Sequence, residues 1–187
     1  MDSFKIEMMI TIYSIVIGFS FSIFREEKLR SFSFAVGLAS ILCLAGRLLS
    51  MQSQFVLAEH NYTEVFFFLD IFIMVAFYRS LTTLRNINQG ETTEEIEGYK
   101  QFWLWFTFTM FLTMLYRLIY SQMAIEWAIA GQLSAIAFCF GGFILAKVMV
   151  KKQVQISTVR KGQFVYSVLL LIGSIAYCAV RFTYTNL

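Results

Sequence analysis

The sequence predicts an all-α membrane protein, a transmembrane bundle of about six helices arranged as three hairpins. Three observations predict this class. First, 58% of the 187 residues are hydrophobic and only 14% are charged, whereas a soluble domain is about one quarter charged. Second, about six apolar windows follow one another, each close to the length that crosses about 30 Å of hydrocarbon. Third, the basic residues gather in alternate connections between these windows.

The predicted spans are, in order, 8–24, 32–51, 62–81, 102–123, 127–150 and 163–184. Most of the connections are short, so consecutive helices should be antiparallel neighbours. The residues before the first span are acidic and weakly basic, and no small-residue cleavage site follows it, so we interpret it as a span rather than a signal peptide. The whole chain, 1–187, is then expected to form a single transmembrane domain.

The connections after the first, third and fifth spans, 25–31, 82–101 and 151–162, are predicted to be cytoplasmic. With the residues at their edges they hold 11 of the 15 Lys and Arg residues, and the other two connections hold none. Basic connections stay on the cytoplasmic side of a membrane. Both termini should therefore lie outside, and the expected location is the inner (cell) membrane of a bacterium.

Asp70 lies inside an apolar run of Phe, Ile, Leu and Val. A carboxylate in hydrocarbon costs at least a few kcal/mol, so Asp70 should have a partner. Arginine suits this role because it stays charged on burial and its planar fork binds a carboxylate in two places. The predicted intramembrane charge cluster consists of Asp70, Glu64, Glu126, Arg47, Arg117 and Arg181. Three interpretations stay open: ion pairs that fix helix register, an outward-facing site for an anion or lipid headgroup, and arginines that each reach the outer surface independently.

The cytoplasmic connections supply a second candidate site. The acidic residues Glu91, Glu94, Glu95 and Glu97 follow turn-forming residues, and a Thr-Thr-Glu-Glu segment there is compatible with a helix cap. The basic residues are Lys151, Lys152, Arg160 and Lys161. Together they predict an acidic surface beside a basic one, able to bind a soluble cytoplasmic partner. The alternatives are a solvated loop and contact of the basic residues with anionic membrane lipids.

Small residues in the fifth span, among them Gly131 and Gly142, make one close-packing face. The fifth span is therefore predicted to be the most buried helix or an oligomer contact. The three cysteines, Cys43, Cys139 and Cys178, are isolated in apolar segments and are expected to act as small buried hydrophobes.

Nothing in the sequence supports catalysis. The single histidine, His60, leaves no Ser–His or Cys–His arrangement, and no phosphate loop is present. We therefore expect no catalytic residue, no metal, no cofactor and no direct binding of nucleic acid.

The predicted function is that of a non-enzymatic membrane sensor or scaffold subunit, a homo-oligomer that holds a soluble cytoplasmic partner. Small polytopic subunits that act with soluble effectors occur in bacterial defence and stress systems, an analogy of architecture alone. The alternative is a small oligomeric anion channel or transporter with the arginines at its outer mouth. The chain has no proline and few glycines inside its spans, which disfavours an alternating-access carrier.

Overall fold

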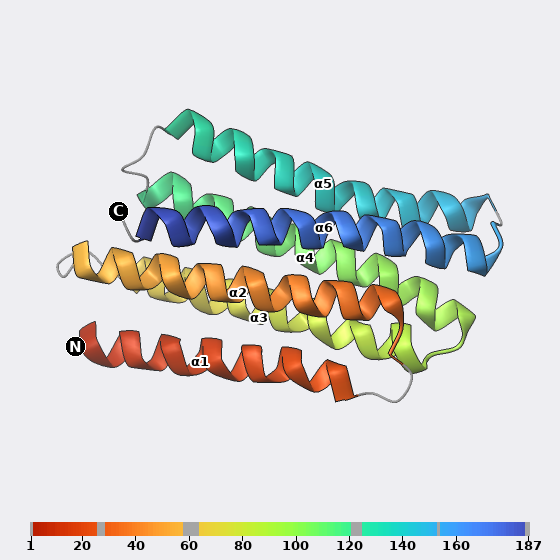
Figure 1. Ribbon diagram of the computed structural model, residues 1–187, viewed down its shortest axis with the longest axis horizontal. Coiled ribbons are helices and arrows are strands. Elements are labelled where there is room, and N and C mark those ends of the chain that lie inside the picture. The colour runs from red at the N-terminus through yellow and green to blue at the C-terminus, as the bar shows by residue number, and fades with distance from the viewer. Residues whose placement is uncertain (1, 26–28, 58–63, 121–124, 153, 186–187) are drawn as a thin grey trace. The chain divides into compact units, whose positions relative to one another are not determined.

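The computed structural model describes residues 2–25, 29–57, 64–120, 125–152 and 154–185. All regular structure in these ranges is helical (Figure 1). The elements are α1 (Asp2–Ser22), the short 3-10 helix η1 (Ile23–Arg25), α2 (Ser31–Leu57), α3 (Glu64–Gln89), α4 (Thr92–Tyr120), α5 (Ile125–Lys151) and α6 (Ile156–Thr185). The prediction of an all-α chain is confirmed.

Among the residues that the structure describes, four helical segments are long and apolar enough to cross a membrane: Glu7–Arg25, Phe67–Gln89, Ala130–Lys151 and Ile156–Ala179. Helix α2 adds a shorter apolar segment, Ser31–Gly46. At a rise of about 1.5 Å per residue, the four longer segments match a hydrocarbon layer about 30 Å thick. These helices are compatible with an integral membrane protein, whereas the count of six spans and the orientation stay predictions.

The connection between α3 and α4 is shorter than the predicted range 82–101. Helix α3 continues to Gln89 and α4 begins at Thr92, which leaves Gly90 and Glu91 between them. The backbone N–H of Glu91 donates to the Glu94 carboxylate at 3.2 Å, which is half of a capping box. This local cap starts α4 among polar residues, well before its apolar part. The predicted connection 151–162 is likewise mostly helical, since α6 begins at Ile156.

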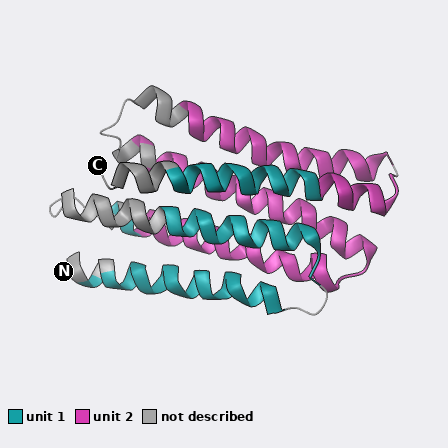
Figure 2. Ribbon diagram, viewed as in Figure 1, with its two compact units in different colours: residues 1–67, 164–187 teal, residues 68–163 magenta. Residues whose placement is uncertain are grey.

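The contacts of the chain group it into two compact units (Figure 2). Unit 1 consists of Met1–Phe67 and Phe164–Leu187, and unit 2 consists of Phe68–Gln163. Helix α6 therefore contributes its first turns to unit 2 and the remainder to unit 1. Each unit is described by itself below, and the single domain expected from the sequence stays a prediction.

In unit 1, helix α1 buries one face, and its members follow the three-to-four-residue spacing of a helix. They are Met9, Tyr13, Val16 and Ser20. Phe24 of η1 makes an edge contact with Phe34 of α2, with ring centroids 5.4 Å apart. Cys43 of α2 and Ser174 of α6 share a hydrogen bond of 3.3 Å between Sγ and Oγ. The thiol of Cys43 is free.

In unit 2, helices α3, α4 and α5 pack as antiparallel neighbours around an aromatic core. Phe77 of α3 lies against Phe106 of α4, with centroids 5.5 Å apart, and Trp103 of α4 makes an edge contact with Phe138 of α5 at 6.3 Å. Gly98 lets α3 and α4 approach closely, because a Cβ there would lie 2.7 Å from the Ile87 side chain. This core supports the polar groups at one end of the unit.

Candidate functional site

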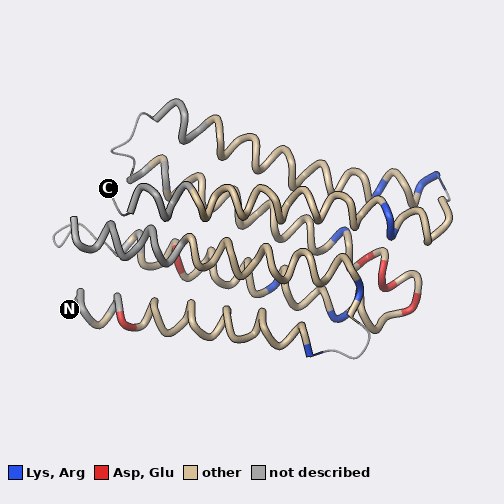
Figure 3. Tube along the Cα trace, viewed as in Figure 1, with Lys and Arg blue, Asp and Glu red and all other residues tan. Residues whose placement is uncertain are grey.

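Most of the charged residues that the structure describes in unit 2 gather where α3 passes into α4 and where α5 passes into α6 (Figure 3). We call this region the charged end. It holds seven basic and four acidic residues: Arg85, Lys100, Lys147, Lys151, Lys152, Arg160, Lys161, Glu91, Glu94, Glu95 and Glu97. The two connections that it includes, 82–101 and 151–162, were predicted from the sequence to be cytoplasmic.

A buried ion pair joins α4 to α6 at the charged end. Arg160 donates from Nε to Oε1 of Glu95 at 2.9 Å and from Nη2 to Oε2 at 2.8 Å. Tyr99 donates its hydroxyl to the same Oε1 at 2.9 Å. The Glu95 side chain is 0% exposed and that of Arg160 is 45% exposed. The carboxylate therefore accepts three hydrogen bonds from these two residues, and the guanidinium covers it from the solvent side.

The position of Glu95 on α4 explains its burial. Glu95, Tyr99, Phe102 and Phe106 follow one another at spacings of four, three and four residues, and all are buried. Such residues lie on one face of a helix. Glu95 thus continues the aromatic face of α4 into its first turns, where it needs a partner of opposite charge.

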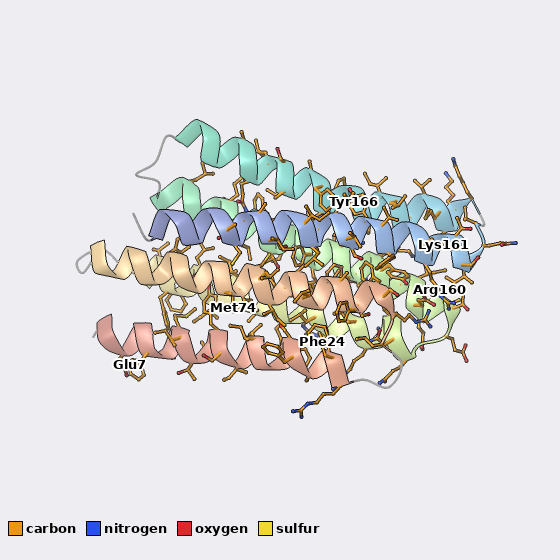
Figure 4. The ribbon with its side chains drawn as sticks, viewed as in Figure 1. Glu7, Phe24, Met74, Arg160, Lys161 and Tyr166 are labelled. Carbon is orange, nitrogen blue, oxygen red and sulfur yellow. The ribbon has the colours of Figure 1, made fainter. Side chains whose placement is uncertain are left out.

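Helix α6 meets this face through two residues one turn apart. Arg160 binds Glu95, and Gln163 accepts a hydrogen bond of 2.7 Å at Oε1 from the indole Nε1 of Trp103. Trp103 and Gln163 are both fully buried. Figure 4 labels Arg160 and the neighbouring Lys161 in the first turns of α6. These two contacts fix the start of α6 against α4 within unit 2.

The remaining acidic residues of the charged end are exposed. Glu91 and Glu94 lie at the start of α4, and Glu97 lies one turn further on. Lys100 donates to Oε2 of Glu97 at 2.8 Å, and Gln101 donates to Oε1 at 2.9 Å. The hydrogen bond from Lys100, with a smaller contribution from Gln101, lowers the pKa of Glu97 below its ordinary value of 4.5.

We expect this depressed pKa to be directly measurable. In a titration of the Glu97 carboxyl carbon by NMR, half-protonation should occur below pH 4.5, and Lys100→Met should move it back towards that value. Because the folded pKa is the lower one, the pair stabilises the fold above pH 4.5 and loses this effect as the pH falls through the folded pKa. For so exposed a pair the effect is at most about 0.5 kcal/mol. An unchanged titration in the Lys100 variant would contradict this cause.

The structure brings together only part of the predicted partner-binding set. Glu95 and Arg160 face each other inside unit 2, and their charges are used within the fold. The other members, Glu91, Glu94, Glu97, Lys151, Lys152 and Lys161, are exposed. The predicted set did not include Tyr99, Trp103 and Gln163, which make these contacts in the structure. The helical spacing from Glu95 to Phe106 was the signal that could have separated Glu95 from the exposed glutamates.

Asp70 is fully buried on α3. It shares a helical face with Ile73, Met74 and Phe77, which are also buried, and Met74 is labelled in Figure 4. The other members of the predicted intramembrane charge cluster belong to helices, but their side chains lie outside the described residues: Glu64, Glu126, Arg47, Arg117 and Arg181. The choice of an arginine partner for Asp70 therefore stays a prediction.

Within the part of the chain that the structure describes, no group of three or more His, Cys, Asp or Glu residues could hold a metal ion. Cys43, Cys139 and Cys178 are free thiols. Comparison of the chain with protein-family profiles, curated proteins and solved structures finds no match. The charged end and the apolar helices are therefore the basis for inferring a function.

Proposed function

We propose that the protein is a non-enzymatic integral membrane sensor or scaffold subunit whose charged end holds a soluble cytoplasmic partner. The observation that carries the proposal is the pair between Glu95 and Arg160. The pair links α4 to α6, so the exposed charged residues on the two helices are held in a fixed arrangement relative to one another. A preorganised surface loses less conformational entropy on binding than a flexible loop does.

The exposed charges provide two regions of opposite sign. Glu91 precedes α4, and Glu94 and Glu97 lie in its first turns. Lys151 and Lys152 lie at the end of α5. Complementary charge across an interface speeds association and discriminates between partners. The partner we propose is a soluble protein that places basic residues against α4 and acidic residues against the end of α5.

The remaining parts of the proposal follow from the intramembrane residues. Asp70, with the arginines predicted to surround it, would be the element that responds to the cell envelope or to an outer ligand. Assembly as a homo-oligomer would present several charged ends together and raise the avidity for the partner. A bacterial defence or stress system is the setting that this architecture suggests by analogy.

A pull-down from native membranes tests the proposal. The tagged protein is extracted in mild detergent and its companions are identified by mass spectrometry, together with a sizing run. We expect a stoichiometric soluble partner whose recovery falls about tenfold in the triple variant Glu91→Gln, Glu94→Gln and Glu97→Gln, because each exposed charge contributes up to about 0.5 kcal/mol. Glu7→Gln, which removes an exposed acid from α1, is the matched control.

Two outcomes would contradict the scaffold. If the triple variant recovered as much partner as the unmodified protein, the charged end would not be the surface that binds it. A homo-oligomer without any partner, whose anion flux in liposomes falls when Arg47, Arg117 or Arg181 is neutralised, would replace the scaffold with the channel.

A further inference from the structure

An exposed apolar stripe on α3 ends in a basic residue. Phe68, Phe72 and Val75 are each more than half exposed, and they recur at spacings of four and three residues. Four residues after Val75, on the same face, lies the exposed Arg79. Arg79 therefore continues an apolar surface, and it lies well before the end of the helix at Gln89.

Helix α5 repeats the pattern. Phe140 and Ile144 are nearly half exposed, and the exposed Lys147 and Lys151 follow at spacings of three and four residues. On α4 the exposed residues Leu104 and Phe108 share a face with Lys100, which is paired with Glu97. Helices α3 and α5 thus each carry an exposed apolar stripe that ends in a basic residue.

The contacts inside unit 2 show which residue of the neighbouring helix α4 lies at the same height along the helix axis as Arg79. Phe77 packs against Phe106 on the antiparallel helix α4. Arg79 comes two residues after Phe77, and Leu104 comes two residues before Phe106, so Arg79 is level with Leu104.

The level of Lys147 follows in the same way. A Cβ on Gly142 would lie 2.5 Å from the indole of Trp103, so these two residues face each other across α4 and α5. Lys147 comes five residues after Gly142 and is level with Gly98, five residues before Trp103. Six residues of α4 separate Gly98 from Leu104, which is about 9 Å along the axis. The two basic residues therefore lie within a layer about 9 Å deep, slightly deeper than the headgroup region of one bilayer leaflet, roughly 5–8 Å.

The charges of this layer are not compensated within the fold. Lys100 and Arg160 have carboxylate partners. Among the residues that the structure describes, Arg79, Lys147 and Lys151 form no ion pair. A surface that combines exposed hydrocarbon with uncompensated positive charge complements a molecule that has an apolar chain and an anionic head.

We propose that the stripes on α3 and α5 bind anionic phospholipid. The acyl chains lie along Phe68 to Val75 and along Phe140 and Ile144, and the phosphates bind Arg79 and Lys147. The guanidinium fork suits a phosphate, and cations at the edge of a membrane attract anionic headgroups. This lipid site goes beyond the scaffold proposal, because it uses the sides of the helices and leaves the glutamates of α4 free.

The test measures lipid selectivity of the purified full chain by native mass spectrometry. Phosphatidylglycerol and phosphatidylcholine with identical acyl chains are titrated into the detergent-solubilised protein. We expect a preference for phosphatidylglycerol that falls about fivefold in Arg79→Gln and about 30-fold in the double variant with Lys147→Gln. The control Arg85→Gln removes the same charge as Arg79→Gln from an exposed position off the stripes and should change the preference less than about twofold.

Equal losses in Arg85→Gln and in Arg79→Gln would overturn the site, because they would indicate a diffuse electrostatic effect. So would an unchanged lipid preference in a double variant that instead loses a soluble protein partner. Arg79→Lys with Lys147→Arg should keep the preference. A second measurement on the unmodified protein does not depend on the folding of variants: phosphatidylglycerol with a photoreactive headgroup should crosslink to peptides that contain Arg79 and Lys147, and crosslinks confined to other peptides would overturn the proposal.

Discussion

Arg160→Met is expected to lower the free energy of unfolding by about 3 kcal/mol, because the buried Glu95 carboxylate loses both charge-assisted hydrogen bonds from the guanidinium. Removing one member of a buried pair costs about 3–5 kcal/mol. The lower end applies here, since the Arg160 side chain is 45% exposed and water can partly replace it. Tyr99 still donates to the carboxylate in the variant. Unfolding in mixed micelles with a rising fraction of denaturing detergent, followed by tryptophan fluorescence, measures the change.

Two further variants distinguish the loss of the ion pair between Glu95 and Arg160 from the loss of a single positive charge. Lys161→Met removes a positive charge from the next residue, which is exposed and has no ion pair among the described residues, and should change stability by less than about 0.5 kcal/mol. Glu95→Leu combined with Arg160→Met removes both charges and should recover much of the loss. If the double variant were as unstable as the sum of its single variants, the two residues would not act as a pair.

Gly142→Ala should destabilise unit 2 by about 1–3 kcal/mol, which is the usual cost of overpacking a core. A Cβ at this position would lie 2.5 Å from Cδ2 and 2.6 Å from Cε2 of Trp103. The indole has little freedom to move aside, because Nε1 donates to Gln163 and the ring makes an edge contact with Phe138. The same detergent unfolding experiment gives the free energy, and the emission of the tryptophans reports on displacement of the ring.

Gly131→Ala is the matched control on the same helix. A Cβ at Gly131 meets no atom within 4 Å, and the residue is exposed. The substitution should be neutral or stabilising by up to about 1 kcal/mol, since alanine loses less backbone entropy than glycine in a helix. Equal effects of the two substitutions would show that close packing against Trp103 is not what requires glycine at 142.

The sequence by itself determined the helical class and the approximate helix positions. Apolar length and helical periodicity are local properties, and a hydrocarbon layer leaves a chain few alternatives to the helix. The sequence also located the charged connections, because charged residues can be identified without knowing which helices are in contact. The ends of the helices were harder to predict from the sequence. Helices α3 and α4 continue through most of the predicted connection 82–101, because its polar residues can form a helix once the Glu94 side chain caps the start of α4.

Tertiary structure alone decided which of these residues meet. Glu95 and Arg160 lie 65 positions apart, and Trp103 and Gln163 lie 60 positions apart, so no local pattern pairs them. The same holds for Gly131 and Gly142, which share one predicted small-residue face although only Gly142 is buried. Burial of a side chain depends on the neighbour that packs over it, and that neighbour is chosen by contacts distant in sequence. Glu95 therefore became an internal partner of Arg160, while Glu91, Glu94 and Glu97 remained on the surface.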